Sequence, residues 1–313
     1  MTVLRQVLLA APRGWCAGVD RAVDIVERAL DLYGPPVYVR KQIVHNRHVV
    51  EGLERRGAIF VNEVDEVPEG SLCILSAHGS APSVYRTAEQ RDLRLIDATC
   101  PLVTKVHVEA IRFRRRDRTI ILIGHAGHEE VEGTMGQAPE RTILVQDVDE
   151  AEHVDVPDPD NVSYITQTTL SVDDTKDIVA TLQRRFPNIS APTKSDICYA
   201  TTNRQAAVKV LADRAPLVLV IGAPNSSNSK RMVEVARQCG AASYLIEDES
   251  QIDPAWLVGV DVVGLSSSAS APEWLVDRVL DHLKAFGPAA VEEVRVVDED
   301  VSFPLPREVA GAV

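Results

Sequence analysis

Short apolar runs alternate with amphipathic stretches along most of the chain. Runs of strand length lie at residues 7–11, 37–40, 58–61, 71–76, 95–97, 119–123, 142–145, 162–166, 217–221, 242–245 and 261–265. Apolar residues at helical spacing lie at 21–32, 46–56, 103–115, 172–185, 202–214, 229–238 and 273–286. Short buried strands that alternate with helices of this length predict an α/β fold built on parallel sheets.

Three of the five cysteines come shortly before predicted helices, at widely separated places in the chain. They are Cys16, Cys100 and Cys198. Because the dipole and the free N–H groups of a helix N-terminus stabilise a thiolate, each is a candidate metal ligand or nucleophile. Cys73 lies inside an apolar run and Cys239 at a helix end, and both are interpreted as small, inert hydrophobic residues.

Two local expectations concern helix starts and loops near these cysteines. The predicted helix at 103–115 is expected to begin at Pro101, with Thr99 as its N-cap. Glu130 lies between Gly127 and Gly133, in a segment that we expect to be a loop. It is a candidate proton donor if its pKa is shifted, and an exposed loop carboxylate otherwise.

Polar loops follow several predicted strands, at residues 76–80, 124–130, 166–169, 222–229 and 266–272. In parallel sheets, ligands bind outside the carboxyl ends of the strands. The sequence Ser226-Ser227-Asn228-Ser229 opens a predicted helix and favours phosphate binding, although N-capping alone could explain it. Histidines at strand–helix junctions are usually structural, but together they could donate hydrogen bonds to a diphosphate; they are His45, His78 and His128.

The three cysteines do not have the paired Cys-x-x-Cys spacing of structural zinc sites. They leave a four-coordinate metal or a cluster one protein ligand short, and in a 4Fe–4S cluster one iron would remain open to substrate. Three cysteine-containing segments of similar length suggest three small αβα units in a pseudo-threefold arrangement around a common site. The expected boundaries are an N-terminal strand at 1–13 that packs with the third unit, units at 14–99, 100–195 and 196–286, and a C-terminal strap at 287–313.

Composition and charge narrow the possible partners of the chain. The 313 residues carry 33 Lys and Arg against 46 Asp and Glu, and the formal charge of −13 argues against nucleic-acid or anionic-membrane binding. The run at 3–11 is too short for a signal peptide, no run could span a bilayer, and five cysteines indicate a reducing compartment. We therefore expect a cytoplasmic protein. The basic cluster between Arg112 and Arg118 is either a solvated helix end or a docking surface for an acidic electron carrier.

Nine motifs carry a family resemblance that covers nearly the whole chain. They lie at residues 12–19, 44–46, 76–79, 97–101, 128–137, 166–171, 196–205, 225–229 and 303–306, and include Asp97-Ala98-Thr99-Cys100-Pro101. Each motif alone is weak, but in this order they closely resemble the 4-hydroxy-3-methylbut-2-enyl diphosphate reductase (LytB) family. Members reduce that allylic diphosphate to isopentenyl and dimethylallyl diphosphates, the last step of the methylerythritol phosphate route to isoprenoids.

The resemblance implies roles for individual residues. Cys16, Cys100 and Cys198 would hold a central 4Fe–4S cluster with one iron not held by a protein side chain, expected as 3Fe–4S after oxidation. Thr168 would orient the substrate hydroxyl and Glu130 would relay protons to it. The diphosphate would be bound by His45, His78, His128, Ser226, Ser227, Asn228 and Ser270. The electron donor would be ferredoxin or flavodoxin.

Two positions depart from the family pattern. Ser268 stands where the family usually has glycine, so a positive φ there would be strained. Glu129 stands where proline is common, which predicts a less rigid loop around Glu130 and an extra negative charge. The alternatives to the reductase are a zinc hydrolase with a phosphate pocket, which would be colourless, and a non-catalytic iron–sulfur sensor. Glu130, Thr168 and the serine-rich loop argue against the sensor.

Overall fold

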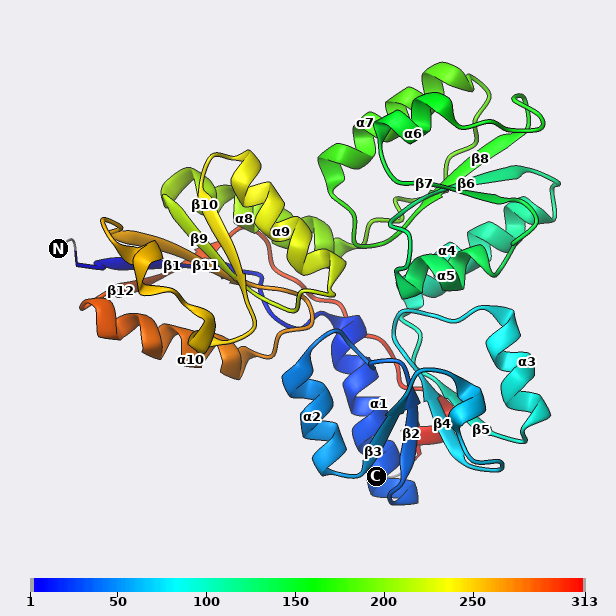
Figure 1. Cartoon of the computed structure of the whole chain (residues 1–313), viewed down its shortest axis with the longest axis horizontal. Coiled ribbons are helices and arrows are strands. Elements are labelled where there is room, and N and C mark those ends of the chain that lie inside the picture. The colour runs from blue at the N-terminus through cyan, green and yellow to red at the C-terminus, as the bar shows by residue number, and fades with distance from the viewer. Residues whose placement is uncertain (1–2, 312–313) are drawn as a thin grey trace. The chain divides into compact units, whose positions relative to one another are not determined.

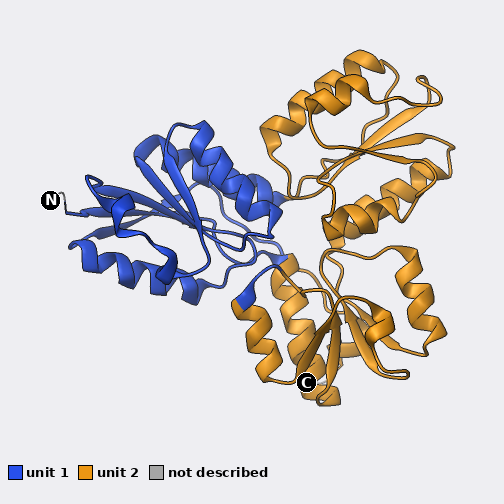
Figure 2. Ribbon diagram, in the orientation of Figure 1, with its two compact units in different colours: residues 1–17, 45–47, 199–302 blue, residues 18–44, 48–198, 303–313 orange. Residues whose placement is uncertain are grey.

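The computed structural model describes residues 3–311, which form two compact units (Figure 1, Figure 2). Of the described residues, unit 1 contains 3–17, 45–47 and 199–302, and unit 2 contains 18–44, 48–198 and 303–311. Each unit is described by itself below. The domain boundaries expected from the sequence stay a prediction.

Unit 1 is built on one parallel sheet with the strand order β10-β9-β11-β1-β12. The strands are β1 (Gln6–Ala11), β9 (Leu217–Ile221), β10 (Ala242–Ile246), β11 (Val262–Ser267) and β12 (Ala290–Arg295). The helices are α8 (Tyr199–Arg214), α9 (Ser227–Gln238) and α10 (Glu273–Leu283). Successive strand residues point to opposite faces, so Leu8 and Ala10 pack with α8 and α9, while Val7 and Leu9 pack with α10.

Unit 2 contains, among its described residues, two further parallel sheets. The first has the order β3-β2-β4-β5 and comprises β2 (Val37–Arg40), β3 (Ala58–Val61), β4 (Leu72–Leu75) and β5 (Arg94–Asp97), with helices α1 (Ala17–Tyr33), α2 (Arg47–Arg55) and α3 (Pro82–Gln90). The second has the order β7-β6-β8 and comprises β6 (Thr119–Ile123), β7 (Thr142–Val145) and β8 (Val162–Thr166). Its helices are α4 (Pro101–Arg114), α5 (Glu129–Met135), α6 (Val148–His153) and α7 (Val172–Arg185).

Both faces of β6 are covered, which explains why this strand is apolar throughout. Ile121 and Ile123 pack in a core with α6 and α7, and Ile120 and Leu122 pack in a second core with α4 and α5. The remaining described elements are α11 (Arg307–Ala310) and short 3-10 turns at Val64–Glu66, Glu249–Gln251, Pro254–Leu257 and Lys284–Phe286. The α/β class with small parallel sheets is as predicted.

The predicted strands and helices are all present, with ends that differ by a few residues. Five further elements are not predicted by the sequence pattern, namely α3, α5, α6, α11 and β12. The omission of α5 matters most, because Glu130 lies in this helix and the prediction that it belongs to a loop was wrong. Within residues 3–311, none of the helices combines the length and the apolar character needed to span a bilayer.

Candidate active site

Each candidate cysteine lies just ahead of a helix. Cys16 comes before α1, Cys198 before α8, and Cys100 occupies the N-cap position of α4. The prediction that Thr99 caps α4 was wrong, because the Thr99 hydroxyl instead donates to Asp97 Oδ1 at 2.5 Å. None of the three forms a disulfide and all are half-buried, a setting that suits metal ligands.

The other two cysteines differ from these three. Cys73 is fully buried in β4, and burial raises the pKa of its thiol to about 11, so that it stays protonated and inert. Cys239 is exposed at the end of α9. Its exposure differs from the buried hydrophobic role expected from the sequence.

Glu130 and Thr168 form a buried pair in unit 2. The Thr168 backbone N–H donates to Glu130 Oε1 at 2.6 Å, and the Thr168 hydroxyl donates to Oε2 at 3.0 Å. Burial raises the pKa of Glu130 to about 7, although the Thr168 hydrogen bonds and nearby His78 favour the ionised form. The charge of Asp196 raises it further. A carboxyl group with this pKa can both hold and release a proton near neutral pH.

His128 fixes the start of the helix that carries Glu130. It is the N-cap of α5, and its Nδ1 accepts a hydrogen bond from the Glu130 backbone N–H at 3.1 Å. Because Nδ1 accepts, a neutral His128 carries its hydrogen on Nε2, which can donate to another group. The His128 and His78 rings meet edge to face, with centroids 6.1 Å apart.

Glu129, at the first position of α5, forms an ion pair with His78. Its Oε2 lies 3.0 Å from His78 Nδ1, and both side chains are largely buried. Burial by itself raises the pKa of Glu129, but the hydrogen bond and charge of His78, with smaller contributions from Lys41 and His128, outweigh it and lower the pKa. The extra negative charge predicted at this position is therefore balanced inside unit 2.

Glycines allow α5 to pack closely on the loop that follows β4. A Cβ on Gly133 would lie 3.0 Å from the carbonyl oxygen of Gly79, and a Cβ on Gly136 would clash with Ala81. Gln137, in the turn after α5, closes this contact because its Nε2 donates to Ser80 O at 3.1 Å. The glycine spacing of the 128–137 motif thus follows from helix packing.

The candidate phosphate-binding residues of unit 1 lie at the carboxyl ends of the adjacent strands β9 and β11. Ser226 is the N-cap of α9, and its hydroxyl accepts from the Ser229 backbone N–H at 3.3 Å. The Ser270 hydroxyl donates to His45 O at 2.9 Å. Asn228 Oδ1 is buried with no hydrogen-bond partner among residues 3–311. Ser227 opens α9 beside it and is also buried. The structure thus brings the five candidates of this unit to one edge of the sheet, namely His45, Ser226, Ser227, Asn228 and Ser270.

Ser268 shows no sign of the strain expected from the sequence. Its φ is not positive; among residues 3–311 the non-glycine residues with positive φ are Lys41, Asp92 and Asp117. The Ser268 N–H donates to Ile221 O at 2.8 Å, and its hydroxyl lies 3.3 Å from the Ser270 hydroxyl. The expectation of strain was therefore wrong, and serine fits this backbone.

Lys105 and Asp196, to which the sequence pattern gives no role, fix the segment before Cys198. Lys105 Nζ donates to Asp196 Oδ1 at 2.5 Å and to Lys194 O at 2.6 Å. Asp196 Oδ2 accepts from the Thr166 N–H at 2.9 Å. The Asp196 side chain is fully buried, and this burial raises its pKa despite the partner lysine. Spacing could not reveal the pair, because its members are far apart in sequence.

The basic cluster lies around the C-terminal end of α4, opposite to the end that begins at Cys100. Arg112 and Arg114 form ion pairs with nearby glutamates, while Arg115 and Arg116 are exposed. A helix of 14 residues is about 21 Å long, so the basic cluster of arginines lies roughly that far from Cys100.

Comparison with known proteins supplies the family. Residues 7–284 match the family model described as LytB protein. The chain belongs to the LytB family. A relative from Acidothermus cellulolyticus is 62% identical over 305 residues, which cover 97% of this chain and 90% of the relative. A relative from Mycobacterium ulcerans is 57% identical over 309 residues, which cover 98% and 93%.

Both LytB relatives are named 4-hydroxy-3-methylbut-2-enyl diphosphate reductase. The solved structure of the E-1-hydroxy-2-methyl-but-2-enyl-4-diphosphate reductase from Plasmodium falciparum is 38% identical to this chain, with a TM-score of 0.94 and coverage of 98% of this chain and 97% of the other. The resemblance seen in the sequence is thereby confirmed, as is the fold class. Membership of this family makes the chain an oxidoreductase.

Proposed function

We propose that the chain reduces 4-hydroxy-3-methylbut-2-enyl diphosphate to isopentenyl and dimethylallyl diphosphates, the last step of the methylerythritol phosphate route. The reaction takes up two electrons and two protons and releases the substrate hydroxyl as water. The names of its close relatives support this substrate. The observation that carries the proposal is the buried pair of Glu130 and Thr168, which can supply protons beside a hydroxyl-binding group.

Glu130 would deliver protons to the reacting end of the substrate. A general acid works best when its pKa is close to the working pH, and burial places that of Glu130 at about 7. Thr168 holds both carboxyl oxygens, which fixes the direction of the proton-bearing atom. The Thr168 hydroxyl would also orient the hydroxyl group of the substrate.

The donor set of the chain fits an iron–sulfur cluster, the cofactor class of this family, and the proposed type is 4Fe–4S. Cys16, Cys100 and Cys198 are half-buried, form no disulfide, and each lies just ahead of a helix. Such a cluster, with one iron not held by a protein side chain, would bind the substrate hydroxyl and supply electrons. The 3Fe–4S form is its expected oxidation product, and this sensitivity agrees with a reducing compartment such as the cytoplasm.

The diphosphate would be bound by neutral donors and by histidines. In unit 1, the start of α9 offers backbone N–H groups together with Ser226, Ser227 and Asn228. Rotation of the buried Asn228 amide would present its Nδ2 to a phosphate oxygen, since its Oδ1 now has no partner among residues 3–311. The remaining proposed ligands are His45, Ser270, His78 and His128.

The electron donor would be ferredoxin or flavodoxin, docked near the basic cluster between Arg112 and Arg118. The exposed Arg115 and Arg116 would meet an acidic carrier, since neighbouring arginines already pair with glutamates of the chain. The length of α4 argues against this location, because the helix separates the basic cluster of arginines from Cys100.

Anaerobic purification tests the proposal directly. Iron and sulfide are assayed, a visible spectrum is recorded, and substrate is added to the same sample with a small chemical reductant. We expect brown protein with about four irons per chain, a spectrum that changes with substrate, and both isopentenyl and dimethylallyl products. Colourless protein that contains zinc, or iron-loaded protein without turnover, would overturn it.

A further inference from the structure

Arg204 of α8 is fully buried, and its guanidinium binds the backbone just before Cys16. Nη2 donates to Gly14 O at 2.7 Å, and Nε donates to the same oxygen at 3.2 Å. Nη2 also lies 3.4 Å from Trp15 O, and Nη1 donates to Ala200 O at 3.1 Å. A buried guanidinium requires acceptors for its N–H groups, and here the turn before Cys16 supplies them.

Glu299, beyond the end of β12, is the charged partner of this arginine. Its Oε1 lies 3.0 Å from Arg204 Nη1 and its Oε2 3.4 Å from Nη2. Asn203 Nδ2 donates to Glu299 Oε1 at 3.0 Å, so neighbouring residues of α8 hold the same carboxylate. A buried charge is stable only with a charged partner and further hydrogen bonds, and Glu299 provides that partner.

The N–H groups of the same turn also donate hydrogen bonds. The Cys16 N–H donates to Ala269 O at 3.3 Å, and the Ala17 N–H donates to the Tyr199 hydroxyl at 3.1 Å. The backbone around Cys16 is therefore fixed through both its carbonyl and its N–H groups.

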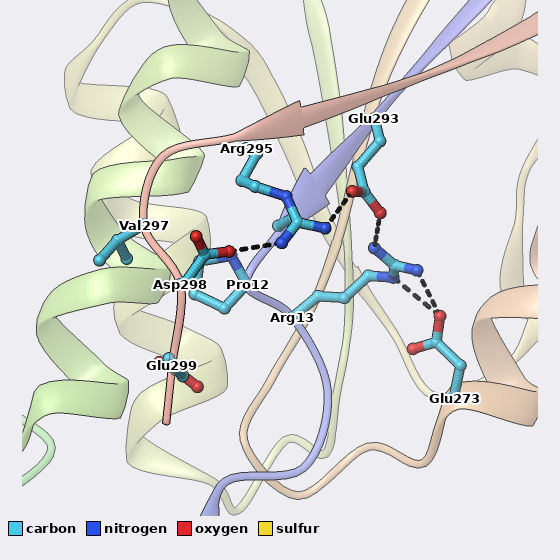
Figure 3. Close-up of a pocket in the computed structure, with 9 residues that line it drawn as sticks. Pro12, Arg13, Glu273, Glu293, Arg295, Val297, Asp298 and Glu299 are labelled. Atoms are coloured by element: carbon cyan, nitrogen blue, oxygen red, sulfur yellow. Dashed lines mark hydrogen bonds and ion pairs between the residues drawn. The ribbon is translucent and has the colours of Figure 1, made fainter. Parts of the chain in front are cut away.

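Exposed charges surround the pocket that Glu299 lines (Figure 3). Arg13 pairs with Glu273 and Glu293, and Arg295 pairs with Glu293 and Asp298. Two arginines meet three carboxylates here, so both arginines are paired and neither is left to bind an anionic ligand. Exposed pairs contribute little to stability, which distinguishes them from the buried pair of Arg204 and Glu299.

We propose that Arg204 and Glu299 form a positioning pair that fixes the turn carrying Cys16, so that its thiol is held in place before metal binds. The relevance to catalysis rests on the proposed function, in which Cys16 is a metal ligand. The pair also makes the geometry of this turn depend on the segment after β12. Neither residue needs to touch the substrate or the reacting atoms.

The test measures how fast iodoacetamide alkylates Cys16 in the full chain prepared without cluster, by mass spectrometry of its peptide. Arg204→Lys keeps the charge but not the fork of donors, and Glu299→Gln keeps the shape but not the charge. We expect alkylation of Cys16 to be about tenfold faster in Arg204→Lys and several-fold faster in Glu299→Gln, because the turn opens locally. Exposed Cys239 is the internal reference and should not change.

Arg214 and Glu292 provide matched controls. They form an exposed ion pair of 2.7 Å between the same helix and β12, the strand that precedes Glu299. Arg214→Gln and Glu292→Gln should leave the rate within about twofold of the original. An unchanged rate at Cys16 in Glu299→Gln, or an equal increase at buried Cys73, would overturn the proposal. If Arg204→Lys fails to fold, Glu299→Gln decides.

Measurements of iron content and of iron release distinguish a failure of this proposal from a failure of the proposed function. Anaerobically purified Arg204→Lys and Glu299→Gln should lose iron to a chelator faster than the original chain, although every cysteine is present. Full iron content in Cys16→Ser would overturn the metal assignment of the proposed function. The alkylation result would still decide whether the pair positions the turn.

Discussion

Glu129 and Glu130 are adjacent in α5, yet their carboxylates have different partners and pKa values shifted in opposite directions. Glu129 pairs with His78, and this charge lowers its pKa. Glu130 is buried against Thr168, and burial raises its pKa to about 7. One helix turn thus holds one carboxylate ionised and another ready to carry a proton.

Glu130→Gln should remove proton delivery but not the cluster. We expect turnover to fall at least about 100-fold, the usual contribution of a general acid, while iron content and substrate-induced spectral change persist. Activity of the original chain should decline above pH 7, as Glu130 loses its proton. Turnover close to normal in the loaded variant would contradict the proposed role, and Glu132→Gln on the same helix is the control.

The stability of the original chain should also depend on Glu130. Its pKa is higher in the folded chain than the ordinary 4.5, so the folded state binds more protons between about pH 4.5 and 7. The free energy of unfolding should therefore fall as pH rises through this window, by about 3 kcal/mol in total. Urea unfolding at pH 5 and pH 8 measures this fall in the free energy of unfolding. An equal fall in Glu130→Gln would show that Glu130 is not its cause.

Glu129→Gln should show the opposite pH dependence. Because the pKa of Glu129 is lowered on folding, its contribution is present above pH 4.5 and is lost as pH falls through the folded pKa. The variant should be about 1 kcal/mol less stable at pH 7 and equal in stability in strong acid. Glu129→Pro should give the same difference, because proline is tolerated at the first position of a helix. A difference that persists in acid would exclude the ion pair as its cause.

Each of Cys16→Ser, Cys100→Ser and Cys198→Ser should lose most of its iron and sulfide when purified anaerobically. Serine does not supply the thiolate that an iron–sulfur cluster requires. The controls are Cys73→Ala and Cys239→Ser, which should retain full iron content. A fully loaded and active variant at any of the three positions would remove that residue from the ligand set.

Ser268→Gly should destabilise the chain by about 1 kcal/mol, since glycine adds freedom to the unfolded chain and there is no strain to relieve. Ser268→Ala serves as the control, because it removes only the hydroxyl that contacts Ser270. Urea unfolding compares the three proteins. A more stable Ser268→Gly protein would show that serine is strained at this position.

Charge reversal at Arg115 and Arg116 tests the docking of the electron carrier. The variant should be reduced more slowly by ferredoxin or flavodoxin at low salt, and as fast as the original by a small chemical reductant. Arg55→Glu together with Arg86→Glu, at exposed positions in α2 and α3, makes the same change in total charge and is the control. Equal activity with the protein carrier would place its docking surface elsewhere, for example nearer to the cysteines.

Most of the fold could be predicted because buried parallel strands and amphipathic helices have strong sequence patterns. The exceptions have physical reasons. Helix α5 has seven residues, with Gly133 inside it, and depends on packing against the loop at Gly79 more than on an apolar face. Strand β12 lies at the edge of its sheet and buries only Val294. Because its other residues are exposed and several are charged, it lacks the apolar pattern by which buried strands are recognised.

The site was predictable where chemistry depends on residue type and local position. Thiols ahead of helices and hydroxyls at the start of α9 could be recognised from a few neighbouring residues. Contacts across long separations could not be recognised in this way. The pairing of Arg204 with Glu299 and that of Lys105 with Asp196 follow from the three-dimensional fold alone.

The position of β1 has a consequence for biosynthesis. This strand pairs with β11 and β12, so a ribosome must complete residue 295 before the first strand has both neighbours. The sheets of unit 2, by contrast, have all their strands once residue 166 has emerged. The turn around Cys16 also has contacts with Ala269 and, through Arg204, with Glu299, so it takes its final form only after residue 299 has emerged. Metal incorporation at Cys16, as proposed, would then come after the strands of all three sheets have been made.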